Sequence, residues 1–464
     1  MPLALTAVLA FFGKSVRESL TLFAILIPIQ AFAVIEAGFT IPPIYILLFL
    51  ILSGVFLRGD RLSMDFPGGR LVVAYLAVVV ISTVYAAVFV DPPQIQFSEW
   101  MRFRASAFRS PLQLLLTIFH FSPLFLIAAA VKSRDSAESL MRVYLWTGFV
   151  LVIIGMYQIL AYIVDLPFKD LTWSINLVPN SNHVNYGMVH IYTAKVTNFS
   201  IRDTFIESRM LADYLLSVVP ITTALWMVGS ERVRERFGKL ALPIVSVLGL
   251  IAIFFTMSRS AWIFLAAGLL VGGMCISPAR FIKRGAIAFI AMIGVTTIMI
   301  KFGLFSAGSF TEIIVGRLNL VDIVTDPRVQ FLVVLWNVFL EHPILGVGAG
   351  NFSIFAAVAL DVPVLVSAHG VLWEALGEFG LVGFSLLLGA FIALFTALVK
   401  AIRRCDDTAS RALLIGLLSA MTALFLNSFT GSDRPPFYLI FCMGMAAVYS
   451  RIILKRSNKL KSIS

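Results

Sequence analysis

A histidine followed by an aromatic residue and two carboxylates is the first group in this sequence that could do chemistry. In "AHGVLWEALGEFGLVG", His369 precedes Trp373, Glu374 and Glu378. An imidazole near neutrality can take a proton from a hydroxyl group, and a carboxylate can orient it or pair with an arginine. The opposing interpretation is a partly buried histidine whose hydrogen bonds are satisfied. We take His369 as a candidate general base and the other three as supporting residues.

Arginines form the second group because they could bind an anionic substrate. Arg259 stands in "FTMSRSAW" with a serine on each side. In "TDPRVQF", Asp326 and the proline after it predict a helix start, with Arg328 in the first turn and an end near Glu341. A guanidinium offers two donors that match phosphate oxygens, and it keeps its charge when partly desolvated. The alternatives are an Arg259 that reaches lipid headgroups and an Arg328 ion pair. Arg317 competes with Arg328, since spacing does not choose between them.

Three alternating glycines precede the histidine in "EHPILGVGAGNF". They suggest a phosphate-binding loop, but the segment lacks the Gly-Lys-Ser/Thr of a P-loop and has no parallel-sheet context. A tight turn that ends one helix and begins the next explains Gly346, Gly348 and Gly350 better. We therefore predict that these glycines position the residues around them.

The elements that must position these residues are membrane spans. The chain has 464 residues, of which 59% are hydrophobic and 13% charged, whereas a soluble domain has about 25% charged residues. Apolar runs of about twenty residues recur, each long enough to cross a bilayer as a helix. We predict an all-α polytopic membrane protein that forms a single integral membrane domain over residues 1–464. About twelve transmembrane helices are expected near 19–38, 40–57, 71–91, 111–131, 143–164, 210–228, 240–257, 261–278, 285–304, 379–399, 412–431 and 436–450.

Clusters of Lys and Arg between these spans set the expected orientation. With both termini in the cytoplasm, the clusters near 58–70, 132–142, 232–239, 280–284 and 400–411 all face inside, as the positive-inside rule requires. The net charge of +11 therefore reports topology, and nucleic acid is not an expected partner.

Three longer segments then face outside, at about 92–110, 165–209 and 305–378. The last two are the predicted external loops, and 305–378 carries the candidate catalytic segment. About nine arginines are expected outside against three lysines, at positions 102, 104, 109, 202, 209, 259, 317, 328 and 434. Because basic residues are unusual on this side of a membrane, we interpret the excess as a binding surface for an anionic substrate.

Metal and disulfide chemistry have no support in the pattern. The outside segments hold no closely spaced histidines and carboxylates of the kind that bind a metal. The three cysteines, Cys275, Cys405 and Cys442, fall in predicted spans or on the inside, so no disulfide framework is expected outside.

Four segments together resemble the O-antigen ligase and polysaccharide polymerase family of bacterial inner-membrane glycosyltransferases. They are "IRDTFIESRMLADYL", "FTMSRSAW", the run from Arg328 to "EHPILGVGAGNF", and "AHGVLWEALGEFGLVG". The resemblance covers about residues 200–385 by motif and the whole chain by its number of spans. Gly370 stands where the family usually has Asn, and Ser208-Arg209 where it usually has Pro-Asn. These departures concern substrate contacts more than the class of reaction.

The resemblance implies a GT-C-like glycosyltransferase that uses undecaprenyl-pyrophosphate-linked glycans at the periplasmic face. It implies His369 as the catalytic base for the acceptor hydroxyl. Arg259, Arg328 and, with a less defined duty, Arg202 would bind the pyrophosphate. Because pyrophosphate is a good leaving group, arginine charge can replace a metal, and an inverting transfer without metal or cofactor is expected.

Two forms of this activity and one other class remain open. We predict a polymerase that joins repeat units of an exopolysaccharide or O-antigen, and a ligase that transfers the glycan to lipid A–core or another acceptor is close behind. The expected partners are the lipid-linked donor, the acceptor, membrane lipids and a chain-length regulator or flippase. A polysaccharide or small-solute transporter would instead carry ionisable residues inside its spans, and only His120 fits that description clearly.

Overall fold

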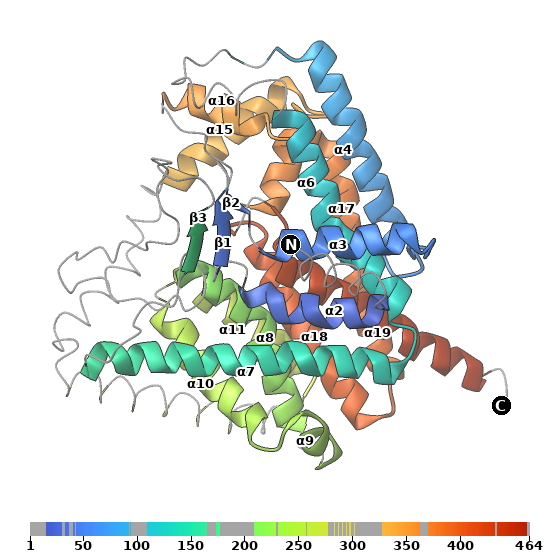
Figure 1. Cartoon of the computed structure of the whole chain (residues 1–464), viewed down its shortest axis with the longest axis vertical. Helices are drawn as coiled ribbons and strands as arrows, with labels where there is room; N and C mark the ends of the chain where they lie inside the picture. The colour runs from blue at the N-terminus through green and yellow to red at the C-terminus, as the bar shows by residue number, and fades with distance from the viewer. Residues whose placement is uncertain are drawn as a thin grey trace, which may run out of the picture.

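The computed structural model describes residues 15–29, 33–36, 40–41, 43–91, 93, 109–164, 173–176, 208–228, 231–256, 258–276, 327–361, 370–431 and 434–461, with single residues at 283, 286, 290, 294, 297 and 301. Helices make up most of these residues (Figure 1). Their bounds are α2 Val16–Leu26, α3 Pro43–Leu57, α4 Gly69–Phe89, α6 Arg109–Ala130, α7 Arg134–Val164, α8 Ser208–Val228, α9 Glu231–Phe237, α10 Ala241–Phe255, α11 Arg259–Met274, α15 Pro327–Glu341, α16 Phe352–Ala359, α17 Val371–Arg404, α18 Thr408–Asn427 and α19 Phe437–Lys461.

The prediction of a helical polytopic membrane protein is confirmed. Among the described residues, seven helices are long and apolar enough to cross a membrane, and α3, α10, α11 and α15 are shorter apolar helices. The seven are α4, α6, α7, α8, α17, α18 and α19. Apart from single residues, the predicted span at 285–304 lies outside the described residues, so the number of twelve stays a prediction.

The first predicted span, 19–38, is wrong beyond Leu26. Helix α2 ends at Leu26, a 3-10 turn follows at Ile27–Ile29, and strand β1 (Ala33–Glu36) comes next. Pro28 supplies no backbone N–H and interrupts the helix. Strand β1 pairs antiparallel with β2 (Thr40–Ile41) and parallel with β3 (Trp173–Asn176). This small sheet is the part of the described fold that an all-α prediction misses.

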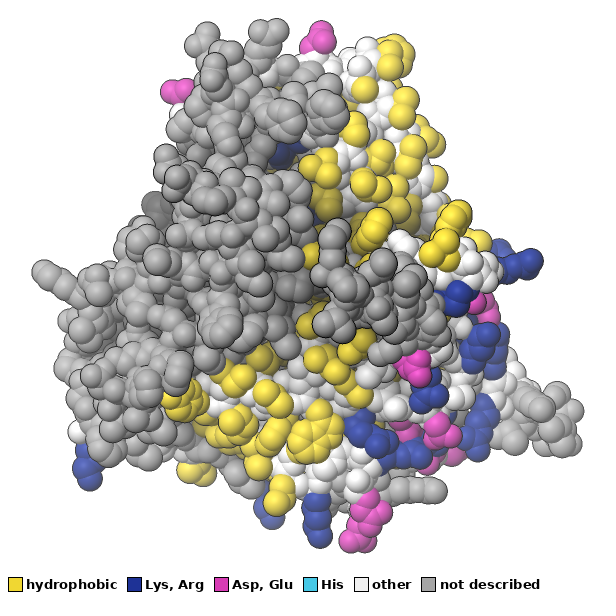
Figure 2. Space-filling view, viewed as in Figure 1, with side chains coloured by type: hydrophobic (Ala, Val, Ile, Leu, Met, Phe, Trp, Pro, Cys, Tyr) yellow, Lys and Arg dark blue, Asp and Glu magenta, His cyan; other side chains and the backbone are white. Residues whose placement is uncertain are grey.

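Two groups of helices form the centre of the described fold. Helices α8, α10, α11 and α18 pack together, and α4, α6, α17 and α19 form the second group, in which α17 and α19 also contact α18. In Figure 1, α15 and α16 lie at the end of the molecule that α4, α6 and α17 approach. Hydrophobic side chains cover the visible side of α4 in Figure 2, where Ile81, Val84 and Phe89 are exposed. An apolar exposed face is what a lipid-facing helix requires.

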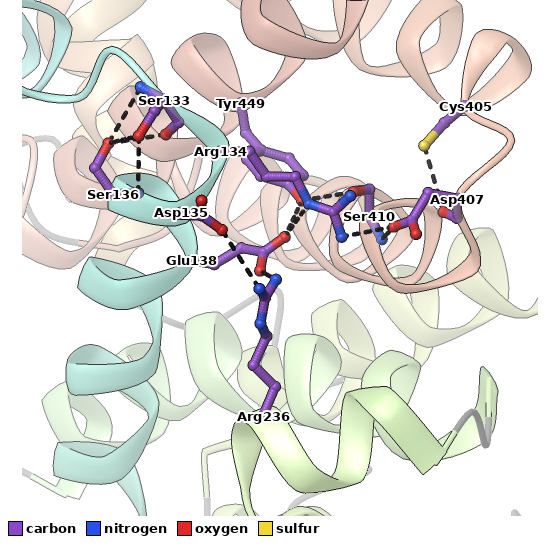
Figure 3. Close-up of polar contacts among 10 residues, drawn as sticks. All are labelled: Ser133, Arg134, Asp135, Ser136, Glu138, Arg236, Cys405, Asp407, Ser410 and Tyr449. Carbon is purple, nitrogen blue, oxygen red and sulfur yellow. Dashed lines mark hydrogen bonds and ion pairs between the residues drawn. The ribbon is translucent and has the colours of Figure 1, made fainter.

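A buried glutamate holds four helices together through charged contacts (Figure 3). Glu138 of α7 is 2% exposed. Its Oε1 accepts hydrogen bonds from Arg134 Nε at 2.5 Å and from the Tyr449 hydroxyl of α19 at 2.9 Å, and its Oε2 accepts one from Arg236 of α9. Arg134 also pairs with Asp407, the N-cap of α18, at 2.7 Å. One carboxylate thus links α7, α9 and α19 directly, and Arg134 extends the network to the start of α18.

We expect the substitution Glu138→Ala to lower the free energy of unfolding by about 3 kcal/mol, because removing one partner of a buried ion pair leaves the other charges uncompensated. The control is Asp135→Ala. Asp135 also pairs with Arg236, but its side chain is 83% exposed, so its loss should cost less than about 1 kcal/mol. Thermal unfolding of the purified protein in detergent measures both. Equal losses would show that Glu138 is not the centre of this network.

Candidate functional site

A polar cavity of about 160 Å³ lies between α4, α6 and α17. Its walls come from segments far apart in the sequence and carry both charges. The lining residues are Tyr75, Arg109, Gln113, Thr117, Gly350, Ser353, Val371, Glu374, Ala375, Glu378, Phe379, Arg434 and Pro435. Two predicted supporting residues, Glu374 and Glu378, therefore line one cavity together with two arginines that were expected to face outside.

The backbone of one residue in the cavity wall, Gly350, lies between opposite charges. Glu378, which is 5% exposed, accepts a hydrogen bond on Oε1 from the Gly350 N–H at 2.6 Å. Arg109 donates from Nε to the Gly350 carbonyl at 2.9 Å and from its terminal nitrogen to the Ser353 hydroxyl at 2.5 Å. A buried carboxylate is costly unless its charge is met by donors, and here a backbone N–H and the nearby Arg109 and Arg434 charges meet it.

Helix α17 is broken at Gly380, directly after the residues that line the cavity. Gly380 has φ 63° and ψ −165°, so the helical conformation stops at Phe379 and resumes after Gly380. A break leaves backbone groups without helical partners. The glycine turn supplies partners on one side, since Val347 N–H donates to the Gly377 carbonyl at 3.2 Å and Gly348 N–H to the Glu378 carbonyl at 2.8 Å.

The segment before the glycines supplies partners on the other side of the break. Leu381 N–H donates to the Pro343 carbonyl at 2.8 Å, and Val382 N–H donates to the Ile344 carbonyl at 3.3 Å. From α4, the Ser82 hydroxyl lies 2.5 Å from the Leu345 carbonyl oxygen and 2.8 Å from that of Glu378. The two motifs singled out in the sequence, "HPILGVGAGNF" and "ALGEFGLVG", are therefore joined backbone to backbone.

Each of the three glycines in the turn approaches a different helix. All have positive φ, at 66°, 80° and 76°, a conformation that favours glycine. A Cβ on Gly346 would lie 2.5 Å from Glu378 C in α17. A Cβ on Gly348 would lie 2.6 Å from Ala86 Cβ in α4, and one on Gly350 would lie 2.5 Å from Gln113 Cγ in α6. Helix α15 ends just before this turn and α16 begins just after it. The prediction of a turn that connects two helices is confirmed.

The predicted site residues are only partly placed. Arg259 begins α11 and is partly buried, and it is not among the described residues that line the cavity. Helix α15 begins at Pro327 and ends at Glu341, as predicted, so Arg328 lies in its first turn, but its side chain lies outside the described part of the structure. His369, Arg202 and Arg317 also lie outside the described residues, and their roles stay predictions.

Trp373 has a packing contact in the structure. Its ring meets Phe429 edge-to-face with centroids 5.4 Å apart, and it is not among the described residues that line the cavity. Its supporting role at the site stays a prediction.

Arg109, Arg434 and Gln113 are site residues that sequence reasoning did not select. Both arginines belong to the set expected outside, but Arg109 and Arg434 are separated by more than 300 residues, and nothing in their local sequence links them. Arg434 donates a hydrogen bond to the Gln113 side chain. The only feature of the sequence that pointed to these two residues was the excess of arginine expected outside. That excess did not indicate which of the nine arginines would line a site.

His120 has a structural role next to this cavity. Its Nδ1 lies 2.9 Å from the Pro435 carbonyl oxygen, which can only accept, so Nδ1 carries the proton. Its Nε2 then accepts from the Tyr45 hydroxyl at 2.7 Å. The imidazole thereby fixes the backbone next to Arg434. The residue that most favoured a transporter has both ring nitrogens engaged in contacts that hold the site.

We expect Gly380→Ala to lower the melting temperature strongly, since a residue with a Cβ is strained at this φ, by about 1–3 kcal/mol, and its Cβ would lie 2.3 Å from the Ile344 carbonyl oxygen. Gly389→Ala in the same helix is the control, because its Cβ would meet only Leu71 at 3.5 Å. That variant should be unchanged or more stable by up to about 1 kcal/mol. Detergent melting curves measure both, and a Gly380→Ala protein as stable as the control would refute the docked break.

Two comparisons bear on what this site belongs to. Residues 244–388 match a family model described as O-antigen ligase. This segment includes Arg259, the glycine turn and Glu378, but neither Arg109 nor Arg434. The chain is also 26% identical over 226 residues to the teichuronic acid biosynthesis protein TuaE of Bacillus subtilis (strain 168), a match that covers 47% of this chain and 46% of TuaE. The chain thus spans about half the length of the curated relative it matches. These findings confirm the resemblance predicted from the sequence: over residues 244–388 the chain is similar to the O-antigen ligase family.

Proposed function

We propose that this protein is a membrane glycosyltransferase of bacterial surface polysaccharide assembly. In this proposal it polymerises glycan repeat units linked to undecaprenyl pyrophosphate at the outer face of the inner membrane. The observation that supports it most directly is that the family-matched segment supplies one wall of a polar cavity in an otherwise apolar helical protein. A cavity with convergent polar groups is the default expectation for a binding or catalytic site.

The proposed reaction is a single displacement. His369 accepts the proton of the acceptor hydroxyl, whose oxygen forms a new bond to the anomeric carbon of the donor. The bond from that carbon to the pyrophosphate oxygen breaks, and the electron pair leaves on undecaprenyl pyrophosphate. Attack opposite to the leaving group inverts the anomeric configuration. In the sequence, His369 precedes the cavity residue Val371 by two positions.

Arginine charge has the task of stabilising the leaving group. Arg259, Arg328 and Arg202 are the proposed ligands of the pyrophosphate, and Arg317 is the alternative to Arg328. Fixed cationic donors can stabilise the charge that develops on the leaving oxygen, and guanidinium groups bind two phosphate oxygens at once. On this proposal no metal ion is needed.

A ligase is the second candidate, because the matching family model is described as O-antigen ligase. It would use the same donor, base and arginines, and would transfer the glycan to lipid A–core or another acceptor. The name of TuaE, a biosynthesis protein of teichuronic acid, supports the polymer-forming alternative. The two differ only in the acceptor.

The activity is tested with purified protein, an undecaprenyl-pyrophosphate-linked oligosaccharide and EDTA. We expect elongated product from the native protein and a loss of about 100-fold or more in His369→Ala, since a positioned general base contributes about that much. His342→Gln is the matched control, because this second histidine follows the end of α15 and does not line the cavity. Arg259→Ala should also reduce the rate strongly. Full activity in His369→Ala would remove the assigned base.

A competition experiment separates the two forms of the reaction. The protein receives a labelled lipid-linked donor together with two acceptors, a second lipid-linked glycan and lipid A–core, in the same vesicles. We expect chains of increasing repeat number on the lipid carrier. Label found only on lipid A–core would contradict the polymerase proposal and establish the ligase.

A further inference from the structure

We propose that the cavity between α4, α6 and α17 binds one uncharged sugar ring of the substrate, and that the pyrophosphate binds elsewhere. This inference rests on the proposed function for the origin of the sugar. The assignment of the ligand as a neutral polyol rests on the charge, hydrogen-bonding groups, size and rigidity of the cavity itself.

Charge is the first argument. The described lining holds two cationic side chains, Arg109 and Arg434, and two acidic ones, Glu374 and Glu378. A pyrophosphate carries several negative charges and is bound by an excess of cationic donors. Both arginines already donate to protein partners, Arg109 to Gly350 and Ser353 and Arg434 to Gln113. The side chains of Glu374 and Glu378 hydrogen-bond each other, and the negative charge that they retain would repel a polyanion, because like charges at close range are costly away from bulk water. The lining thus favours a ligand without net charge.

Hydrogen-bonding capacity is the second argument. Each sugar hydroxyl both donates and accepts, so it is best bound where donors and acceptors alternate. The wall offers carboxylate acceptors, guanidinium donors and the amide of Gln113. The hydroxyls of Thr117 and Ser353 donate to the carbonyls of Gln113 and Gly350, so their oxygens remain as acceptors. The same wall includes the apolar surfaces of Tyr75 and Phe379, which suit the C–H faces of a pyranose.

Size is the third argument. The cavity measures about 160 Å³, well above the space that one water molecule needs. This volume is enough to hold a single monosaccharide unit. A subsite of this size therefore binds one sugar unit of a longer glycan, and the rest of the glycan extends beyond the cavity.

The hydrogen bonds divide the lining into residues that fix the shape of the wall and residues that we assign to contact the sugar. Arg109 and Glu378 are committed to the backbone carbonyl and N–H of Gly350, so they shape the wall. Glu374 is less buried, lines the cavity one helical turn before Glu378 and hydrogen-bonds the Glu378 side chain. We assign Glu374 and Thr117 as residues that contact the sugar directly. Glu374→Gln keeps a hydrogen-bonding group beside Glu378, so these substitutions should change binding while the backbone contacts that hold the turn remain.

The test measures sugar binding without catalysis. Saturation-transfer NMR is recorded on the full-length protein in nanodiscs with neutral methyl pyranosides of glucose, galactose, mannose and N-acetylglucosamine, and with methyl glucuronide. We expect binding of at least one neutral glycoside that millimolar inorganic pyrophosphate does not displace. Glu374→Gln should weaken it by about tenfold or more, since a hydrogen bond to a charged group contributes about 1.5–3 kcal/mol.

Two further variants keep the result interpretable. Thr117→Val preserves the shape of the side chain and removes its hydroxyl, and it should also weaken binding. Glu341→Gln neutralises an exposed acid at the end of α15, outside the cavity, and should leave binding unchanged. A native melting temperature establishes that each variant is folded. Equal losses in all three variants would overturn the site.

Other outcomes separate this inference from the proposed function. Displacement of the glycoside by inorganic pyrophosphate, or stronger binding of methyl glucuronide, would show an anion site and overturn the inference. Absence of glycoside binding in a protein that elongates lipid-linked glycan would overturn the sugar subsite and leave the enzyme proposal standing. Glycoside binding that responds to Glu374→Gln, in a protein without transferase activity, would support the cavity assignment and refute the proposed function.

Discussion

The described site depends on one backbone interaction, the docking of the glycine turn onto the break in α17. At Gly380 the helix gives up its regular hydrogen bonds, and the segment from Pro343 to Gly348 replaces them from both sides. Without the break, the carbonyl of Glu378 would be used within its own helix, and the turn would have no place to bind. Without the turn, the break would leave unpaired backbone groups, which are costly away from water. Each element is therefore stable only because the other is present.

The same interaction explains why charged side chains can be buried nearby. Once Gly346 is docked on α17, Gly350 is brought against α6, where Arg109 and Glu378 meet its carbonyl and its N–H. The two side chains come from helices far apart in the sequence and bind the backbone of the same residue. A second charged cluster, around Glu138, serves a different purpose, since its contacts join helices without lining the cavity. Buried charge thus has a local partner in both clusters.

Sequence reasoning succeeded where a local pattern carries the information. Apolar runs predicted α4, α6 and α8 closely, and the glycine spacing predicted a turn between two helices. It failed at 19–38, where the composition remains apolar although Pro28 and β-branched residues change the backbone. It also could not pair Arg109 with Arg434, because their proximity arises from tertiary packing. Glu374 and Glu378 were selected for their distance from a histidine along a helix, and the structure shows a reason that the sequence does not contain, namely a shared cavity with Gly350.

The division between backbone and side-chain contacts also bears on how such a site can change its substrate. The turn, the break and α4 are held mainly by N–H, carbonyl and hydroxyl groups, so the scaffold asks little of most side chains beyond glycine at the points of closest approach. The side chains of Glu374 and Thr117 line the cavity without taking part in those docking contacts. A change at either position can therefore alter which ligand fits while the wall stays in place. A substitution at Arg109 or Glu378 would act differently, because it would displace the Gly350 peptide and change the shape of the cavity for every ligand.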